Sequence, residues 1–385
     1  MKRSIGFLIP LLWLTGAACG SVGGNAQPQN KPPVAPRSVA ETPASKPAPK
    51  LEELFGDNKY QLTGVAVSAK GRLFTNYPIW SPVHKYSVVE VTSKTDAKPY
   101  PNEDVNSWKD GEDGSRKFVS VQAVYVDDQD KLWVVDSANP GFAGVYQESD
   151  KLVRINLDTN KIERIYPMKG IIDKDRYIND VRVDTKRQIA YITNSNEGGI
   201  VIVDLKSGKV RMVLKGAPPT QTDPSYKFMI GGREVAMGGK LMKVNSDGIA
   251  LTPDGEWLFF KPLTDDKLYK VKSADLHNAE LKDSELTARV VDLGHFNVTD
   301  GMEFDKYGNL YMGDMEKNAI IKLSPNLEKT VLMTDARLLW PDSYAVSKDG
   351  YLYISTSHLH TAPPFNDGVD KRTLPYGLFR LEIGP

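Results

Sequence analysis

The sequence contains a single cysteine, Cys19, in 385 residues. Without a second cysteine the chain cannot form an intrachain disulfide, so the stability of an exported domain must come from packing. The sequence also lacks an excess charge of either sign, because 49 Lys and Arg residues balance 49 Asp and Glu residues. A neutral chain excludes a strongly basic nucleic-acid-binding protein as the expected class, and we expect no nucleic acid partner.

The motifs of several common enzyme classes are missing as well. None of the five histidines has the HExxH or His–Cys spacing of a zinc site. The sequence contains no GxSxG motif, P-loop or dinucleotide-binding fingerprint. These absences leave the site to be inferred from the organisation of the chain.

The N-terminal residues are typical of a targeting segment. Lys2 and Arg3 precede the apolar run SIGFLIPLLWLTGAA, which is short for a membrane span, so residues 1–18 are predicted to be a signal peptide. Cys19 follows small residues, and this resembles a bacterial lipobox, although Gly16 stands where leucine is commonest. A lipidated Cys19 predicts a membrane-anchored lipoprotein in the periplasm or at the cell surface. The alternative is ordinary cleavage and secretion.

Residues 19–50 are predicted to be a disordered tether after that cysteine. Residues 20–50 contain seven prolines and almost no large apolar side chains. Such a segment cannot bury enough apolar surface to offset the entropy lost on ordering. We therefore expect one folded domain over residues 51–385, with the membrane contacted only through the lipid anchor.

Six segments of this domain repeat one pattern, in which a polar residue is followed by an alternating strand, a turn and a second strand. Their first positions are separated by 59, 57, 68, 53 and 42 residues. In four segments a glycine stands eight residues after the first position, where a tight hairpin needs a positive φ. The segments are TGVAVSAKGRLFTNY, QAVYVDDQDKLWVVD, NDVRVDTKRQIAYIT, DGIALTPDGEWLFFK, DGMEFDKYGNLYMGD and DSYAVSKDGYLYIST.

Each pair of strands is followed by a third alternating run, and most repeats add a fourth. Repeated units of four antiparallel strands predict an all-β fold, a six-bladed β-propeller. The last repeat has no fourth strand before the chain ends, and residues 51–56, LEELFG, are placed to supply it and close the ring. A β-sandwich built from the same hairpins is the alternative.

The first positions of the repeats are the candidate site. The innermost strands of a propeller face its central channel, so we expect these side chains to gather near one mouth. Carboxylates in a narrow channel repel one another unless a cation joins them. The ligand-binding candidates are Thr63, Gln122, Asn179, Asp247, Asp300 and Asp342.

Two kinds of cation fit such a ring. Asn179, Asp247 and Asp300 offer the oxygen ligands that Ca²⁺ prefers, which makes calcium the candidate cofactor. An organic amine would pair with the carboxylates while an aromatic residue packs on its body, for which the candidates are Tyr177, Trp340 and Tyr344. The structural alternative is that these Asp side chains only bond backbone N–H groups in the turns.

Catalysis would need a proton-transferring group near the ring. Asp300 and His358 are the candidates for a general base, since the long loop after the second strand of the sixth repeat would bring His358 over the mouth. The alternative for His358 is an ordinary loop residue. The long connections 216–246 and 361–375 are expected to cover the site, the first through methionines that form either an adaptable lid or plain packing.

Several longer segments together carry a family resemblance: GVAVSAKGRLFTNYPIW, VQAVYVDDQDKLWVVDSA, DGIALTPDGEWLFFKPLTDDKLYKV and WPDSYAVSKDGYLYISTSHLH, followed by FNDGVDKRTLPYGLFRLEIG. They resemble the Yellow/major royal jelly protein family, including its bacterial members. The resemblance covers nearly all of residues 51–385. It implies an exported six-bladed propeller in a family whose insect members are linked to dopachrome conversion or bind biogenic amines. Insect members also use disulfides that this chain cannot form.

A more distant similarity is to the gluconolactonase/senescence-marker propellers. It implies a divalent metal held in the channel by Glu, Asn, Asn and Asp from the inner strands. Asn179 and Asp300 fit that pattern, whereas Asp247 replaces an Asn and Thr63 stands where Glu is expected. Asp342 would partly restore the missing charge.

Three functions from different classes follow. The first is a monomeric propeller that binds a small cationic or aromatic molecule in its channel, with isomerase or tautomerase activity on a catechol-like substrate. The second is a calcium-dependent, lactonase-like hydrolase. The third is a surface scaffold in which the ring only stabilises turns.

Overall fold

The computed structural model describes residues 49–171 and 176–384. The expected signal peptide, the lipidation candidate Cys19 and nearly all of the expected tether fall within residues 1–48, outside the described residues. The chain from Ala48 to Pro385 forms one compact unit. Within its described part, no helix has the length and apolar character needed to cross a membrane.

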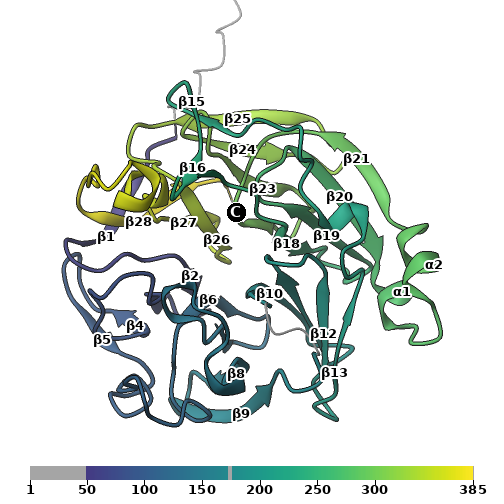
Figure 1. Cartoon of the computed structure of the whole chain (residues 1–385), viewed down its shortest axis with the longest axis horizontal. Coiled ribbons are helices and arrows are strands. Elements are labelled where there is room, and N and C mark those ends of the chain that lie inside the picture. The colour runs from purple at the N-terminus through teal and green to yellow at the C-terminus, as the bar shows by residue number, and fades with distance from the viewer. Residues whose placement is uncertain (1–48, 172–175, 385) are drawn as a thin grey trace, which may run out of the picture. The chain divides into compact units, whose positions relative to one another are not determined.

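Six four-stranded antiparallel sheets are arranged as a ring of blades, so the fold is a six-bladed β-propeller, as the repeats predict (Figure 1). Blade 1 contains β2 (Val65–Val67), β3 (Leu73–Asn76), β4 (Val88–Val91) and β5 (Ala97–Pro99). Blade 2 contains β6 (Val121–Val126), β7 (Lys131–Asp136), β8 (Lys151–Asn156) and β9 (Lys161–Pro167). Blade 3 contains β10 (Ile178–Asp184), β11 (Ile189–Asn194), β12 (Ile200–Asp204) and β13 (Val210–Val213).

The second half of the ring follows the same order of strands. Blade 4 contains β18 (Ser246–Leu251), β19 (Trp257–Pro262), β20 (Lys267–Lys272) and β21 (Val291–His295). Blade 5 contains β22 (Met302–Phe304), β23 (Leu310–Asp314), β24 (Ala319–Leu323) and β25 (Lys329–Thr334). Blade 6 contains β26 (Pro341–Val346), β27 (Tyr351–Thr356), β28 (Tyr376–Glu382) and β1 (Glu52–Asp57).

Short elements occupy the connections between these strands. Two α-helices, α1 (Ser273–His277) and α2 (Asp283–Thr287), lie between β20 and β21. Two small hairpins lie between blades 3 and 4: β14 (Met229–Ile230) with β15 (Arg233–Glu234), and β16 (Ala236–Met237) with β17 (Lys240–Leu241). The 3₁₀ helices are η1 (Pro140–Phe142), η2 (Tyr146–Glu148), η3 (Pro218–Thr220), η4 (Leu359–Thr361) and η5 (Pro363–Phe365).

The ring is closed by the first strand of the domain. β1 pairs antiparallel with β28, and Phe55 stands opposite Leu378. Both side chains are buried, Phe55 at 2% exposure and Leu378 at 0%. Blade 6 therefore combines three strands from the end of the chain with one from its beginning, and the prediction for residues 51–56 is confirmed.

The alternation of apolar residues along the strands builds a core between neighbouring blades. One cluster joins Trp133 and Leu152 of blade 2 to Val181, Ile192 and Val201 of blade 3. All five side chains are at most 1% exposed. Because both faces of each sheet are covered by a neighbour, apolar burial around the ring is the main source of stability.

The Asp-Gly pairs at the start of β18 and just before β22 mark the closest approach of neighbouring blades. A Cβ atom on Gly248 would lie 2.4 Å from the carbonyl oxygen of Asp300, and one on Gly301 would lie 2.7 Å from that of Asp342. The backbone N–H of Gly301 donates to this oxygen of Asp342 at 2.7 Å. Glycine is required at these positions because any side chain would push the blades apart.

Candidate functional site

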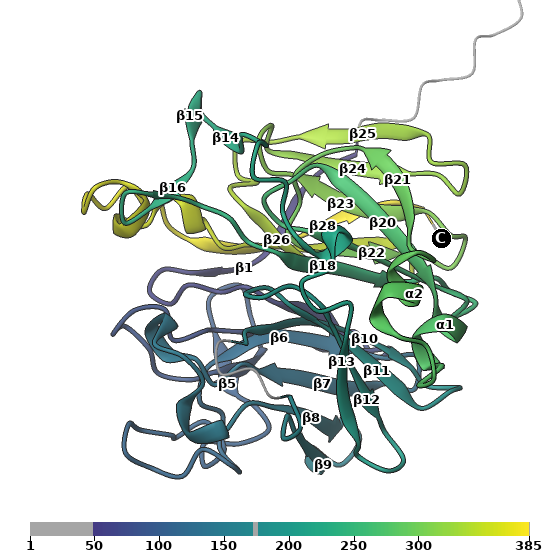
Figure 2. The same cartoon turned by 45° about the vertical axis from the view of Figure 1, so that its right-hand side comes forward.

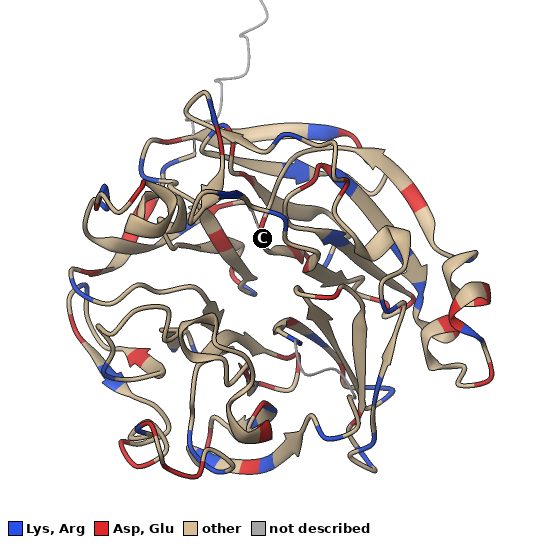
Figure 3. Cartoon of the chain, in the orientation of Figure 1, with Lys and Arg blue, Asp and Glu red and all other residues tan. Residues whose placement is uncertain are grey.

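The six ring positions stand where the inner strand of each blade begins. Gln122, Asn179, Asp247 and Asp342 lie in β6, β10, β18 and β26, and Thr63 and Asp300 lie two residues before the first residues of β2 and β22. All six side chains are at most 8% exposed. Figure 3 shows acidic segments on the strand ends nearest the centre of the ring.

Four of the six ring residues line one cavity of about 390 Å³: Gln122, Asn179, Asp247 and Asp300. Thr63 and Asp342 are not among the lining residues. The hydroxyl of Thr63 instead donates to the backbone carbonyl of Gln122 at 2.9 Å, which ties blade 1 to blade 2. The ring thus has two roles, since some members face the cavity and others hold blades together.

Asp247 is the centre of the polar wall of this cavity. Its Oδ2 accepts a hydrogen bond from Asn179 Nδ2 at 2.7 Å and another from Ser195 Oγ at 3.1 Å. Its Oδ1 is buried and has no hydrogen-bond partner in the described part of the chain. The side chains of Asp247 and Asp300 also share a hydrogen bond, which raises the pKa of Asp247, so a cationic ligand at this wall would replace the proton between the two carboxyl groups.

Asp300 lies beside Asp247 and titrates far above an ordinary aspartate. Burial raises the pKa of Asp300 to about 7, against the opposing effect of the Trp340 indole, and the negative charge of Asp180 raises it further. The Trp340 Nε1–H donates to Asp300 Oδ2 at 2.7 Å. The pKa values of Asp247 and Asp342 are also raised well above the ordinary range. Burial is the largest cause, and the negative charge of Asp300 is the second.

Asp180 is a member of this cluster that the sequence analysis missed. Burial raises its pKa, and the positive charge of Arg182 opposes the shift. The residue directly follows Asn179 on β10, so it occupies the second position of the repeat, which is Gly, Ser or Ala in other blades. A search for acidic residues at the second position as well as the first would have found it.

A buried lysine lies close enough to act on the same carboxylates. Lys261 is 1% exposed, and burial lowers the pKa of its ammonium group to about 8, although Asp265 and Asp247 oppose this. Its Nζ donates to the backbone carbonyls of Pro262 at 2.5 Å and Asp265 at 2.8 Å. Its charge lowers the pKa of Asp300, so Lys261 offsets part of the negative potential of the cluster.

Aromatic rings form a second wall of the cavity. Phe142 stacks on Trp80 at 5.8 Å and on Tyr177 at 5.9 Å between ring centroids, and all three line the cavity. The Trp80 indole donates to the Tyr177 hydroxyl at 3.1 Å, and that hydroxyl donates to Gln122 Oε1 at 2.6 Å. This chain of contacts fixes the aromatic wall relative to the ring.

Of the three aromatic candidates predicted from the sequence, only Tyr177 lines the cavity. Trp340 is completely buried and lies behind Asp300, where its indole orients the carboxylate. The hydroxyl of Tyr344 donates to the backbone carbonyl of Pro341 at 3.3 Å. Trp80 and Phe142 were not expected, because both belong to irregular connections that the repeat pattern does not describe.

His358 does not join the carboxylates. It adopts a left-handed conformation, with φ of 53°, and its neighbour Leu359 lines the cavity instead. One ring nitrogen, Nδ1, contacts the carbonyl of Thr373 at 2.8 Å and the other contacts the hydroxyl of Thr356 at 3.3 Å. His358 is not among the residues that line the cavity, so its role as a general base stays a prediction, and Asp300 is the general-base candidate that lines the cavity.

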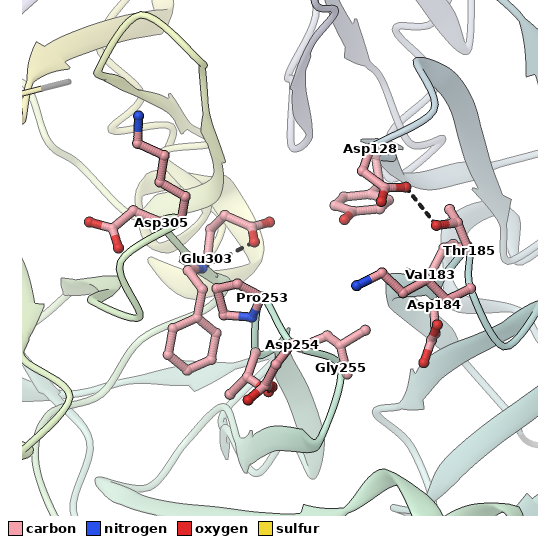
Figure 4. A pocket seen from close by; sticks show the side chains of 15 residues that line it. Asp128, Val183, Asp184, Thr185, Pro253, Asp254, Gly255, Glu303 and Asp305 are labelled. Atoms are coloured by element: carbon pink, nitrogen blue, oxygen red, sulfur yellow. Dashed lines mark hydrogen bonds between the residues drawn. The ribbon is translucent and has the colours of Figure 1, made fainter.

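The opposite ends of the inner strands surround a second opening (Figure 4). Its acidic side chains are engaged in local contacts: Asp128 accepts a hydrogen bond from Thr185 at 2.7 Å, and Asp184 pairs with Arg187 at 2.8 Å. Asp305 accepts a backbone hydrogen bond from Tyr307 at 2.9 Å. These carboxylates stabilise turns, which is the structural alternative raised for the ring.

A buried ion pair borders the second opening. Arg182 of β10 reaches across to Glu303 of β22, with 3.1 Å between Nε and Oε2. The guanidinium also lies over the ring of Tyr125 of β6, 5.0 Å from its centroid. Tyr125 and Glu303 line the second opening, and neither is among the residues that line the first cavity.

The fit of the ring to a metal ion is limited. Across residues 49–171 and 176–384, no group of three or more His, Cys, Asp or Glu side chains is arranged to hold one. Asn179 also turns its amide nitrogen, a donor, toward Asp247. The arrangement offers a negatively charged wall and an aromatic wall, which together suit an organic cation.

Comparison with known proteins agrees with the fold. The sequence model described as Major royal jelly protein matches residues 119–366. No protein with a curated description matches the chain.

Solved structures with the same architecture share little sequence with this chain. A luciferin-regenerating enzyme has a TM-score of 0.53 at 14% identity, covering 87% of this chain and 95% of its own. Virginiamycin B lyase from Staphylococcus aureus has a TM-score of 0.51 at 13% identity, covering 87% and 99%. A gluconolactonase from Xanthomonas campestris has a TM-score of 0.51 at 11% identity, covering 87% and 90%. At these identities the likeness establishes the fold alone.

Proposed function

The chain belongs to the major royal jelly protein family, and on that premise we propose that its propeller binds a small organic cation with an aromatic body. The observation that carries the proposal is Asp247, whose buried Oδ1 has no donor among the described residues. An ammonium group placed there would satisfy this oxygen and neutralise a cluster that otherwise must hold protons.

The remaining walls suit the other part of such a molecule. Trp80, Phe142 and Tyr177 present aromatic surface to the cavity, which can pack on a ring or on the cation itself. A volume of about 390 Å³ falls within the usual range for small-molecule sites. The contacts therefore favour an arylalkylamine or a similar compound over a sugar or an anion.

Asp300 supports an isomerase activity on the bound molecule. A carboxyl group whose pKa is raised to about 7 can both take and return a proton near neutral pH. In a tautomerisation, Asp300 would remove a proton from one atom of the substrate and deliver it to another, which requires no co-reactant. The Trp340 hydrogen bond would hold the carboxylate in place during both transfers.

Binding is tested by titrating phenethylamine into the purified full chain and into its Asp247→Asn variant in a calorimeter. We expect the variant to bind at least tenfold more weakly, because it loses a charge-assisted contact at a buried site. Asp128→Asn removes the same charge at the opposite opening and should retain the affinity of the unmodified protein. No binding to the unmodified chain, or equal binding by the Asp247 variant, would refute the proposal.

Calcium is the competing occupant of the same carboxylates, and it is distinguished by thermal unfolding of the chelator-treated chain with and without Ca²⁺. Saturation at about 100 times the dissociation constant would stabilise the folded state by about 2.7 kcal/mol. A rise of the midpoint that disappears in Asp247→Asn would assign the ring to a metal and favour the hydrolase. An unchanged midpoint leaves the organic cation as the occupant.

A further inference from the structure

The connection between β13 and β18 carries an insert that reaches the cavity. Figure 2 shows β14, β15 and β16 on one side of the ring, with β16 beside the yellow connection between β27 and β28. The turn between β16 and β17 consists of Gly238 and Gly239, whose φ angles are 58° and 76°, so a two-residue hairpin forms without strain. We call residues 236–241 the lid hairpin.

The lid hairpin is fastened to blade 6. The backbone N–H of Gly238 donates to the carbonyl of Pro364 at 2.8 Å. Just before the hairpin, the guanidinium of Arg233 donates to the carbonyl of Phe365 at 3.0 Å and to Asn366 Oδ1 at 2.8 Å. These contacts hold the hairpin in a defined position over the mouth of the channel.

Side chains from the insert line the same cavity as Asp247 and Asp300. Some are apolar, which fits the expectation that methionines of this connection cover the site. Two are lysines, and they bring a positive charge to a cavity whose other charged residues are acidic. The insert residues that line the cavity are Met237, Lys240, Leu241, Met242, Lys243 and Val244.

The two lysines differ in how their ammonium groups are used. Lys243 Nζ donates to the backbone carbonyl of Tyr226 at 2.7 Å. The ammonium of Lys240 is exposed and has neither a hydrogen bond nor an ion pair within the described ranges. Neither lysine pairs with Asp247 or Asp300. The cavity therefore has a negatively charged wall and, separately, a rim that carries the positive charges of the two lysines.

We propose that Lys240 of the lid hairpin binds a second, anionic group on the ligand, so that the preferred ligand is a zwitterion such as an aromatic α-amino acid. This inference rests on the proposed function, in which Asp247 receives the ammonium group. The carboxylate of the ligand then points outward to the rim. A cavity with opposite charges at its two ends favours a molecule with the complementary charges over one that carries only the cation.

The test compares how tightly the full chain binds an amine and the amino acid that differs from it by an added carboxylate. Phenethylamine and L-phenylalanine form one pair, and tryptamine and L-tryptophan form a second pair with a larger ring. We expect the amino acid of a pair to bind about five- to tenfold more tightly, the size of one charge-assisted contact at a partly exposed site. Lys240→Gln should abolish this preference while leaving the affinity for the amine unchanged.

Lys348→Gln is the matched control, because Lys348 is an exposed lysine at the opposite opening. It should retain the full preference for the amino acid. If the unmodified chain binds the amine as tightly as the amino acid, or if Lys240→Gln keeps the preference, the inference is overturned while the proposed function stands. If neither member of either pair binds, the proposed function fails and the inference fails with it.

Discussion

Asp300 lies among other buried acidic groups, and water does not screen the repulsion between their charges. Besides burial, the negative charges of Asp180 and Asp300 raise the pKa values of Asp247 and Asp342, and the charge of Asp180 also raises the pKa of Asp300. The positive charge of Lys261 opposes part of the shift of Asp300. A folded state that contains such a cluster without a ligand keeps protons that the unfolded chain would release. The same protons would leave when a cation binds, so the cluster links binding to pH.

The stability of the unliganded protein should therefore fall as the pH rises from about 4 to about 7. In this window the folded state binds more protons than the unfolded state, because the pKa of Asp300 is raised to about 7 from its ordinary value. Asp300→Asn should remove part of the decline, on the order of 1 to 3 kcal/mol. Urea unfolding of both proteins at a series of pH values measures the difference.

The difference in stability between the unmodified protein and Asp300→Asn isolates the contribution of the Asp300 carboxyl group. Burial lowers the pKa of His360 to about 4, and other titrating groups act in the same way in both proteins. Parallel curves for the two proteins would show that Asp300 is ionised throughout. In that case the cluster could not link binding to pH through Asp300.

The inner strands carry both the site and the contacts between blades. An Asp-Gly pair lies at the start of β18 and another just before β22, and in each the aspartate faces the centre while the glycine lets the next blade approach. Further ties between inner strands come from hydroxyl groups, such as Thr193 Oγ1, which donates to the carbonyl of Asp247 at 2.7 Å. A change in the spacing of these strands would therefore disturb the cavity and the ring together.

Gly248→Ala should destabilise the propeller by about 1 to 3 kcal/mol, since the added Cβ would lie 2.4 Å from the carbonyl oxygen of Asp300. Chemical denaturation followed by tryptophan fluorescence measures the loss. Ser343→Ala is the control, because Ser343 follows Asp342 at the equivalent position of blade 6 and already carries a Cβ. Equal stability of both variants would show that the inner strands can move apart freely.

At the level of the whole chain, stability depends on a strand contributed from far away in the sequence. β1 covers the outer edge of blade 6, and Arg380 of β28 forms an ion pair with Glu52 of β1 at 2.8 Å. Without β1, the edge of β28 and the apolar core around Phe55 would be exposed. If the pairing of β1 with β28 is lost, we expect the ring of blades to open at blade 6.

Deleting residues 1–57 should therefore prevent the domain from folding to a soluble monomer or lower its unfolding midpoint by many degrees. Deleting residues 1–48 is the matched control, because it keeps β1 and should leave the midpoint unchanged. Size-exclusion chromatography and thermal unfolding distinguish the two truncated proteins. Equal midpoints would show that blade 6 is stable with three strands and that β1 is dispensable.

The six blades could be predicted because each repeat carries its own pattern. Alternating apolar residues specify the strands locally, and the glycines eight positions after the polar residue specify the hairpins. The polar first positions likewise pointed to the inner strands, and the cavity does contain Gln122, Asn179, Asp247 and Asp300. Strand β1 was predictable by counting, since the last repeat lacked a fourth strand.

The remaining features of the site depend on contacts between residues far apart in the chain. Trp80 and Phe142 come from connections without a repeat, and the stacking of Phe142 on Trp80 and on Tyr177 exists only once blades 1, 2 and 3 are packed. His358 is not among the residues that line the cavity, and the lid hairpin reaches the cavity because blade 6 holds it there. Periodicity determines which residues form strands, whereas the path of an irregular loop depends on the surfaces it meets after the blades assemble.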